Sequence, residues 1–177
     1  MKNILSILFP IMTSIAFAQN NKEERLRIAN EMETTIHQML NAWYPAGMDT
    51  LYGGFLSEFT YDFKPTANQN KFIVTQARHT WSNCKAAMRY PDVAYYKTLA
   101  QHGYKFLHDI MWDKTYGGFY TMVDRKGNVV DSTKNAYGNA FGIYALAAYC
   151  KLTNDPDAMN WFTIAFENVC DQLAWPS

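Results

Sequence analysis

The chain has no surplus of charge of either sign. Its 177 residues include 16 lysines plus arginines and 16 aspartates plus glutamates. The basic residues also form no stripe of the kind that neutralises successive phosphates of a nucleic acid. The sequence therefore argues against nucleic acid as a partner.

Cysteine is scarce as well. Cys84, Cys150 and Cys170 are too few and too scattered for a disulfide framework. Each falls in a helical pattern among apolar neighbours, so we predict three buried free thiols, although an oxidising compartment would permit one bridge. None of them has metal-ligand spacing, and no nucleotide-binding motif is visible. The sequence thus predicts neither a metal nor another cofactor.

Aromatic residues, in contrast, are abundant, at 16% of the chain. Tyrosine and tryptophan combine a large apolar surface with one polar atom, which suits a core that retains hydrogen-bonding groups. The same rings suit a site that binds sugars, because their faces can stack on pyranose C–H groups. Core packing accounts for most of them.

Residues 1–18 have the pattern of a secretory signal peptide. Lys2 gives a positive start, residues 4–17 are mostly apolar, and Ala16-Phe17-Ala18 fits the small–x–small cleavage rule. We therefore predict export, to a periplasm, of a mature chain comprising residues 19–177. The apolar run is too short to span a bilayer, and no cysteine follows the cleavage point to carry a lipid anchor, so no membrane association is expected after cleavage. A buried amino-terminal helix is the alternative.

The mature part contains an internal repeat. Residues 49–55 (DTLYGGF) recur 64 positions later as residues 113–119 (DKTYGGF). Each copy follows a helical pattern that ends in a tryptophan, Trp43 or Trp112, and precedes a β-rich stretch and another helix. The repeating unit is therefore helix, hairpin, helix.

Apolar periodicity predicts five helices. They cover about residues 23–43, 73–88, 92–111 and 132–152, and a fifth begins at Asp155-Pro156. Tyr90-Pro91 closes the second helix, and Asp131 or Ser132 is the predicted N-cap of the fourth. A hairpin is predicted with strands at 118–123 and 128–130 around a turn at 124–127, and residues 54–63 are a second candidate.

The fourth helix has almost no polar face, so it must be covered on more than one side, as an inner helix of a two-layer helical barrel would be. The fifth helix is rich in large apolar residues, and repeat proteins bury such faces by stacking on a neighbouring unit. We therefore expect a chain truncated within a larger repeat fold. A small bundle that closes on itself is the alternative.

Four motifs, taken in order, resemble the N-acylglucosamine 2-epimerase family. They are residues 49–55, Gln76-Ala77-Arg78-x-x-Trp81, residues 116–120 (YGGFY) and Lys134-x-x-Tyr137-x-x-Ala140-Phe141. The similarity is greatest to the cellobiose 2-epimerase branch. It implies an all-α fold, a barrel of six helical hairpins called (α/α)₆, of which residues 19–177 would supply the amino-terminal five of twelve helices.

The resemblance also implies a reaction and two site residues. The reaction removes and returns the proton at carbon 2 of an opened reducing-end sugar, through an enediolate. Arg78 matches the family's arginine beside the reacting carbon, and its charge suits an enediolate. Tyr137 matches a tyrosine that hydrogen-bonds the substrate. A surface ion pair for Arg78 and a core position for Tyr137 are the structural alternatives, and packing support is the better interpretation of Lys134 and Trp81.

The family's catalytic histidines lie on later helices, so the resemblance implies that this chain alone is inactive. Its own histidines, His37, His79, His102 and His108, are predicted to be surface or satisfied core residues. The expected partner is a small carbohydrate.

Two other functions stay open. One is an (α/α)₆ glycoside hydrolase with Asp49 and Asp113 as its acids, although both aspartates precede a repeated Tyr-Gly-Gly turn, and holding that turn explains them better. The other is an exported helical-repeat module that binds glycans or a protein without catalysis.

Overall fold

The structure is a computed structural model that describes the backbone of residues 2–173 and the side chains of residues 21–171. It divides into two units, Met1–Pro45 and Ala46–Ser177. Within the described residues, no helix is both long enough and apolar enough to span a membrane.

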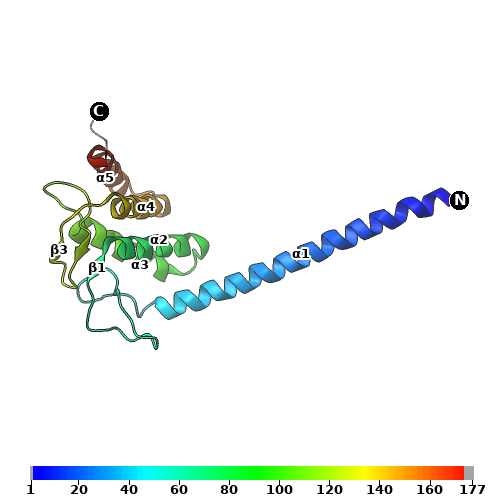
Figure 1. Cartoon of the computed structure of the whole chain (residues 1–177), viewed down its shortest axis with the longest axis horizontal. Coiled ribbons are helices and arrows are strands. Elements are labelled where there is room, and N and C mark those ends of the chain that lie inside the picture. The colour runs from blue at the N-terminus through cyan, green and yellow to red at the C-terminus, as the bar shows by residue number, and fades with distance from the viewer. Residues whose placement is uncertain (1, 174–177) are drawn as a thin grey trace. The chain divides into compact units, whose positions relative to one another are not determined.

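The first unit is a single helix, α1 (Lys2–Trp43), which ends at the tryptophan predicted to close it (Figure 1). It begins well before residue 23, where apolar periodicity first became visible. Arg27 forms ion pairs with Glu24 on the preceding turn, at 2.7 Å, and with Glu31 on the following turn, at 2.6 Å. The predicted signal peptide falls on residues whose side chains lie outside the described part, so it stays a prediction.

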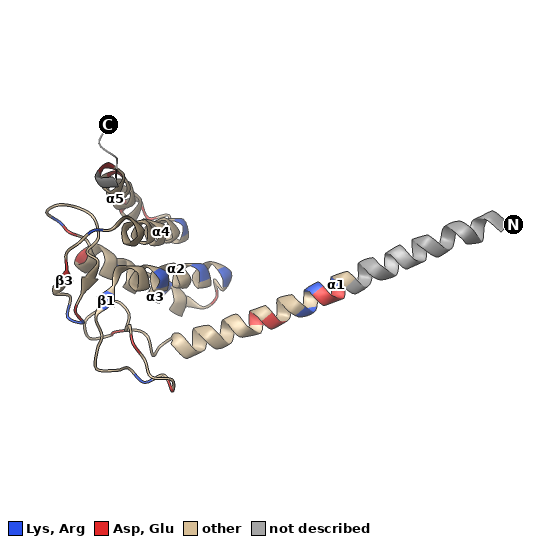
Figure 2. Ribbon diagram, viewed as in Figure 1, with Lys and Arg blue, Asp and Glu red and all other residues tan. Residues whose placement is uncertain are grey.

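The second unit contains the other helices and a small sheet (Figure 1). Its elements are β1 (Lys71–Phe72), α2 (Ile73–Arg89), α3 (Ala94–Phe106), the π-helical turn η1 (Leu107–Met111), β2 (Met122–Val123), β3 (Val129–Asp131), α4 (Ala136–Thr153) and α5 (Pro156–Leu173). Helices dominate, which confirms the all-α class. Acidic and basic residues are interspersed along these elements (Figure 2).

The predicted helices are confirmed, with one cap corrected. Neither Asp131 nor Ser132 caps α4, because β3 keeps the chain extended through Asp131. Asn135 is the N-cap instead, and its side-chain oxygen accepts a hydrogen bond of 2.6 Å from the N–H of Gly138. α5 begins at Pro156 as predicted, with the Asp155 carboxylate accepting from the N–H of Asp157 at 3.0 Å.

The hairpin is present but its first strand is shorter than predicted. β2 covers only Met122–Val123, because positive φ angles at Gly117 and Gly118 keep the preceding segment in a turn. β2 lies between β3 and β1 in an antiparallel sheet, with Lys71 opposite Val123. In the other candidate hairpin, residues 54–63, no strand forms, and Phe59 makes only an isolated bridge to Pro65.

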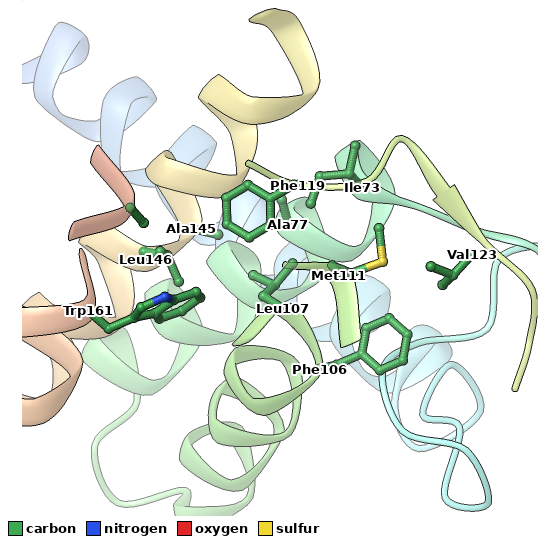
Figure 3. Close-up of a cluster of buried hydrophobic side chains, with 11 residues drawn as sticks. Ile73, Ala77, Phe106, Leu107, Met111, Phe119, Val123, Ala145, Leu146 and Trp161 are labelled. Carbon is green, nitrogen blue, oxygen red and sulfur yellow. The ribbon is translucent and has the colours of Figure 1, made fainter. Parts of the chain in front are cut away.

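The core lies where α2 packs against α3 and α4, and α4 packs against α5, and it includes the loop that precedes the hairpin (Figure 3). Phe119 is completely buried there, against Gly142 of α4. A Cβ on Gly142 would lie 2.3 Å from the Phe119 ring, so the absence of a side chain permits this contact. The main cluster consists of Ile73, Ala77, Phe106, Leu107, Met111, Phe119, Val123, Ala145, Leu146, Trp161 and Ala165.

Candidate functional site

The two copies of the repeated sequence, called the first loop (residues 49–55) and the second loop (residues 113–119), have the same geometry. Asp49 Oδ1 accepts hydrogen bonds from the N–H groups of Leu51 and Tyr52, both at 3.2 Å. Asp113 Oδ1 accepts from the two equivalent groups at 2.9 and 3.0 Å. Two glycines with positive φ follow in each loop. The turn-holding role predicted for the aspartates is confirmed.

Each aspartate also forms an ion pair with a lysine that stands just before an inner helix. Lys71 Nζ lies 3.0 Å from Asp49 Oδ2, and Lys134 Nζ lies 2.7 Å from Asp113 Oδ2. Lys134 therefore has the supporting role predicted for it. The two lysines are 63 residues apart, as are the helix positions that follow them.

These pairings hold both carboxyl groups in the ionised form. Burial raises the pKa of Asp49, but hydrogen bonds from Arg125 and Lys71 outweigh it and lower the pKa to about 2. Burial also opposes the shift at Asp113, where the Lys134 hydrogen bond and two backbone N–H groups lower the pKa to about 2. A glycosidase needs one protonated carboxyl group as its general acid, and neither aspartate can serve.

Arg125, at the turn of the hairpin, fastens the hairpin to the first loop. Its Nε lies 3.0 Å from Asp49 Oδ2, and its guanidinium stands 5.5 Å above the Tyr52 ring. Lys71 Nζ donates in turn to the carbonyl of Arg125 at 3.0 Å and to the carbonyl of Gly53 at 2.5 Å. Neither Lys71 nor Arg125 was predicted from the sequence as a residue of this site. The recurrence of lysine at 71 and 134 was the available signal for the first of them.

An amide side chain at the start of each inner helix binds the backbone of the adjacent loop. Gln76 accepts from the N–H of Phe55 and donates to its carbonyl, both at 2.8 Å. Asn139, 63 residues later, accepts from the N–H of Phe119 at 2.8 Å. These contacts, called the amide clamps, are buried and fix the rotation of α2 and α4 about their axes.

The clamps determine where the two predicted site residues point. Arg78 is two residues after Gln76, and Tyr137 is two residues before Asn139, which places each about 200° round its helix from the clamp. Both side chains are exposed, and Tyr137 exposes 66% of its surface. In the described part of the chain Tyr137 therefore lies outside the buried core, and within residues 21–171 Arg78 forms no ion pair; the site roles of both residues stay predictions.

Aromatic side chains cover the same face of α2 and α4. Trp81, one turn after Arg78, stacks on Tyr144 with ring centroids 5.1 Å apart and planes at 21°. Phe141 lies edge-on to both Tyr137 and Tyr144, with centroids at 4.9 and 6.4 Å. These α4 residues and Ala140 line an open, almost wholly apolar hollow of about 350 Å³. We call the set of Arg78, Trp81, Tyr137, Phe141 and Tyr144 the aromatic face.

The four histidines have other contacts. His79 stacks on Phe55 with centroids 4.8 Å apart, and burial, helped by the charge of Arg78, lowers its pKa to about 4. His102 Nε2 lies 2.7 Å from the carbonyl oxygen of Gly54. His108 pairs with Asp109 at 2.6 Å, and His37, on α1, lies 3.8 Å from Glu33. The prediction of surface or satisfied core histidines is confirmed.

The cysteines depart from their prediction at one position. Cys84 and Cys150 are buried free thiols, and burial raises the pKa of Cys84 to about 12. Cys170 is exposed, because its side chain falls on the outer side of α5 rather than toward the core. In the part of the chain whose side chains are described, no group of histidine, cysteine and carboxylate side chains could hold a metal ion.

Comparison with known proteins identifies relatives across most of the chain. Residues 53–176 match the model of the N-acylglucosamine 2-epimerase family. A cellobiose 2-epimerase of Dictyoglomus turgidum is 36% identical over 110 residues, which are 61% of this chain and 28% of that protein. A D-mannose isomerase of Thermobifida fusca is 35% identical over 78 residues, 41% of this chain and 19% of that protein.

A solved structure is similar to this chain as well. The cellobiose 2-epimerase of Spirochaeta thermophila superimposes with a TM-score of 0.76 at 30% identity, covering 82% of this chain and 36% of that protein. The chain thus spans about a third of the length of the cellobiose 2-epimerases it matches. The helices of the second unit have the arrangement of part of an (α/α)₆ barrel, as predicted.

Proposed function

The chain belongs to the N-acylglucosamine 2-epimerase family, and on that basis we propose that it takes part in epimerising or isomerising a sugar at carbon 2. The substrate class is a mono- or disaccharide with a free reducing end, as the names of the relatives indicate. The aromatic face is the part of the sugar site that this chain provides.

The reaction opens the reducing-end sugar, removes the proton at carbon 2 and forms an enediolate. Return of the proton to the other face of carbon 2 gives the epimer, and its return to carbon 1 gives the ketose. Negative charge develops on oxygen in both cases. Arg78 is suited to stabilise that charge, because its guanidinium is always protonated and presents several fixed donors.

The observation that carries this proposal is the shared face of Arg78 and the aromatic side chains. A sugar ring has apolar C–H patches that pack on aromatic rings and hydroxyl groups that need donors and acceptors. The face offers the Trp81–Tyr144 stack, the Tyr137 hydroxyl and the Arg78 cation on two neighbouring helices. Tyr137 is assigned to hydrogen-bond a substrate hydroxyl.

The base that abstracts the proton is not among the histidines of this chain. His79, His102 and His108 contact Phe55, the first loop and Asp109 respectively, and His79 has a pKa of about 4, too low to retain a proton near neutrality. From the resemblance to the family, we expect the bases to lie in the part of the relatives that this chain does not match. We expect the chain by itself to bind sugar and not to turn it over.

Two measurements on the chain test this. Titration with cellobiose and with mannose, followed by tryptophan fluorescence and by NMR, should show saturable binding that perturbs Trp81. Arg78→Ala and Tyr137→Phe should weaken it, whereas Arg89→Ala, an exposed cation three turns further along α2, should not. Absence of binding to both sugars, or equal effects of the two arginine variants, would remove the support for this site.

Incubation of the sugars with the chain in D₂O separates catalysis from binding. Deuterium at carbon 2, detected by NMR, would show that the chain contains its own base and would contradict the assignment above. Binding without exchange is the expected result. If a hybrid barrel, made by joining the chain to those repeats of a relative that it does not match, also binds without exchange, the chain is a glycan-binding module rather than part of an epimerase.

We also propose that the chain is exported, with cleavage after Ala18. The support is the positive start, apolar run and small–x–small pattern of residues 1–18. Expression in a bacterium with a functional secretion system, followed by intact mass measurement, should give a protein that begins at Gln19. Retention of residues 1–18 in the cytoplasmic fraction would overturn this.

A further inference from the structure

The two inner helices, α2 and α4, contain basic residues but no acidic ones. The basic residues are Arg78, Lys85 and Arg89 on α2 and Lys151 on α4 (Figure 2). Over the whole chain, in contrast, 16 acidic residues balance 16 basic ones. The acidic side chains are therefore confined to other segments, and the two helices that bear the aromatic face have a net positive charge.

Lys85 lies on the same side of α2 as Arg78 and Trp81. It follows Arg78 by seven residues, which is about 20° short of two full turns and about 10 Å along the helix axis. Its Nζ lies 5.5 Å from the centroid of the Trp81 ring. Both cations are exposed, and within residues 21–171 neither forms an ion pair with a carboxylate. Lys85 therefore adds a second cation beside the aromatic face, two turns from the first.

The repeat shows that the packing of the inner helices does not require these two cations. The equivalent positions of α4, 63 residues later, are occupied by Phe141 and Ala148, and Ala148 is buried. The aromatic position between them is kept in both helices, as Trp81 on α2 and Tyr144 on α4. The two positive charges are therefore particular to α2, and the architecture that the repeats share does not explain them.

The contact with Trp81 explains only part of the Lys85 side chain. The hydrocarbon stem of a lysine can cover an aromatic ring while its charge stays in water, and an uncharged side chain of similar length would do the same. The cation–π contact does use the charge, but it contributes little at an exposed position. An anion bound at Lys85 would use the charge more fully, because an ammonium group forms its strongest hydrogen bonds with a carboxylate or a phosphate.

We propose that the sugar bound at the aromatic face carries an anionic group, a carboxylate or a phosphate, at the end remote from its reducing carbon, and that Lys85 binds this group. The inference rests on the proposed function, because it takes Arg78 to lie at carbon 2. A sugar that packs on Trp81 from there extends along α2 toward Lys85. The absence of carboxylates from both inner helices favours an anion, since a surface of one sign raises the local concentration of ligands of the opposite charge. The substrate class is thus a reducing sugar acid or sugar phosphate.

Two matched pairs of sugars test this by NMR titration of the isotopically labelled full chain. One pair is cellobiose and its derivative with the terminal hydroxymethyl group of the non-reducing sugar oxidised to a carboxylate. The other is mannose and mannose phosphorylated on its hydroxymethyl group. We expect the acidic member of at least one pair to bind about fivefold more tightly, with shifts at Trp81 and Lys85 and a preference that shrinks as salt is added. A preference for the carboxylate alone would assign a disaccharide acid, and one for the phosphate alone a monosaccharide phosphate. Equal affinities within both pairs would overturn the proposal.

Variants of Lys85 test whether its charge is responsible. Lys85→Met removes the charge but keeps a side chain that can cover Trp81, so it should abolish the preference for the acidic sugar and leave the affinity for the neutral one unchanged. Lys85→Arg should retain the preference. Lys97→Met, at an exposed position of α3, is the matched control and should bind both sugars as the parent does. If Lys85→Met weakens neutral and acidic sugars equally, or if Lys97→Met has the same effect as Lys85→Met, Lys85 does not bind the anion and the proposal is wrong.

The neutral sugars distinguish a failure of this inference from a failure of the proposed function. If cellobiose or mannose binds through Arg78 and Tyr137 but the acidic sugars bind no more tightly, the proposed function stands and the anion site does not. If no sugar binds, neutral or acidic, both are overturned. Binding of an acidic sugar that Lys85→Met abolishes and Arg78→Ala leaves unchanged would separate the anion from the sugar site, and it would also overturn the inference.

Discussion

Trp81 of α2 and Tyr144 of α4 occupy equivalent positions of two repeats, and their rings stack on one another at 5.1 Å. Their separation in sequence, 63 residues, is that of Lys71 from Lys134 and of Gln76 from Asn139. The two inner helices, α2 and α4, therefore face each other with equivalent residues of the two repeats. The aromatic face follows from this repetition, because each helix is rotated by its own amide clamp.

The Trp81–Tyr144 stack should contribute measurably to stability. In a double-mutant cycle of Trp81→Ala and Tyr144→Ala, we expect a coupling energy of about 0.5–1.5 kcal/mol from urea unfolding, the usual value for an aromatic pair. Each single variant should also weaken sugar binding. Tyr61→Ala, which removes an aromatic ring without a buried contact, is the control. Independent effects of the two substitutions would show that the stack contributes no pairwise stabilisation.

Removing an amide clamp should cost more than removing an exposed amide. Gln76→Ala leaves the N–H and carbonyl of Phe55 buried without their partners, which we expect to destabilise the fold by about 2–4 kcal/mol. Gln101→Ala, an exposed glutamine on α3, should change the unfolding free energy by less than about 0.5 kcal/mol. Similar losses for the two variants would rule out the clamp as a stabilising contact.

Acid should weaken the fold through Asp49. Its pKa is about 2 in the folded chain against 3.8 when unperturbed, so its carboxylate stabilises the fold above about pH 4, and this contribution is lost as the pH falls toward 2. As the pH is lowered between these values, the free energy of unfolding should fall less steeply for Asp49→Asn than for the parent chain. The variant should also be less stable than the parent at pH 4. Asp157→Asn, at an exposed position, should keep the parent slope. An unchanged slope in Asp49→Asn would contradict this role.

Gly142 should not tolerate a methyl group. The Cβ of alanine would lie 2.3 Å from the Phe119 ring, and the ring is buried on every side. We expect Gly142→Ala to destabilise the chain by about 1–3 kcal/mol through overpacking, despite the better helix propensity of alanine. Ala140→Ser, at an exposed position on the same helix, should be close to neutral. A stabilised Gly142→Ala would mean that the ring moves aside without cost.

One thiol of three should react. Cys170 is exposed, whereas Cys84 and Cys150 are buried and burial raises the pKa of both thiols. A colorimetric thiol reagent should therefore modify one equivalent rapidly in the folded chain and three in urea. Cys170→Ser should remove the rapid phase. Fast modification that persists in this variant would show that a buried cysteine is reached.

The sequence predicted those parts of the structure that local periodicity encodes. Helix spans at α2 and α5 follow from apolar spacing and from proline, and the Asp-x-x-Tyr-Gly-Gly turn follows from residues within a few positions of one another. The N-cap of α4 was assigned wrongly, because Asp131 and Asn135 are both good caps, and only the pairing of β3 decides between them. Local composition does not carry that information.

The residues of the candidate site, too, were predicted from the sequence only in part. Arg78 and Tyr137 were found by resemblance to the family, and their common face follows from helix geometry once the amide clamps are known. Arg125 was not predicted, because its partner, Asp49, is 76 residues away. A single arginine in a turn does not indicate such a contact. Long-range ion pairs of this kind become visible only when the two repeats are compared in space.

The loops repeat after 64 residues and the helices after 63, so the segment around the hairpin is one residue shorter in the second copy. This difference does not rotate α4 relative to α2, because the amide clamps set the orientation of each helix from its own loop. The connecting segment can therefore differ in length between the two copies without changing which helix positions face each other. The aromatic face keeps its alignment because it depends on the contact of each helix with its own loop, and not on the length of the chain between them.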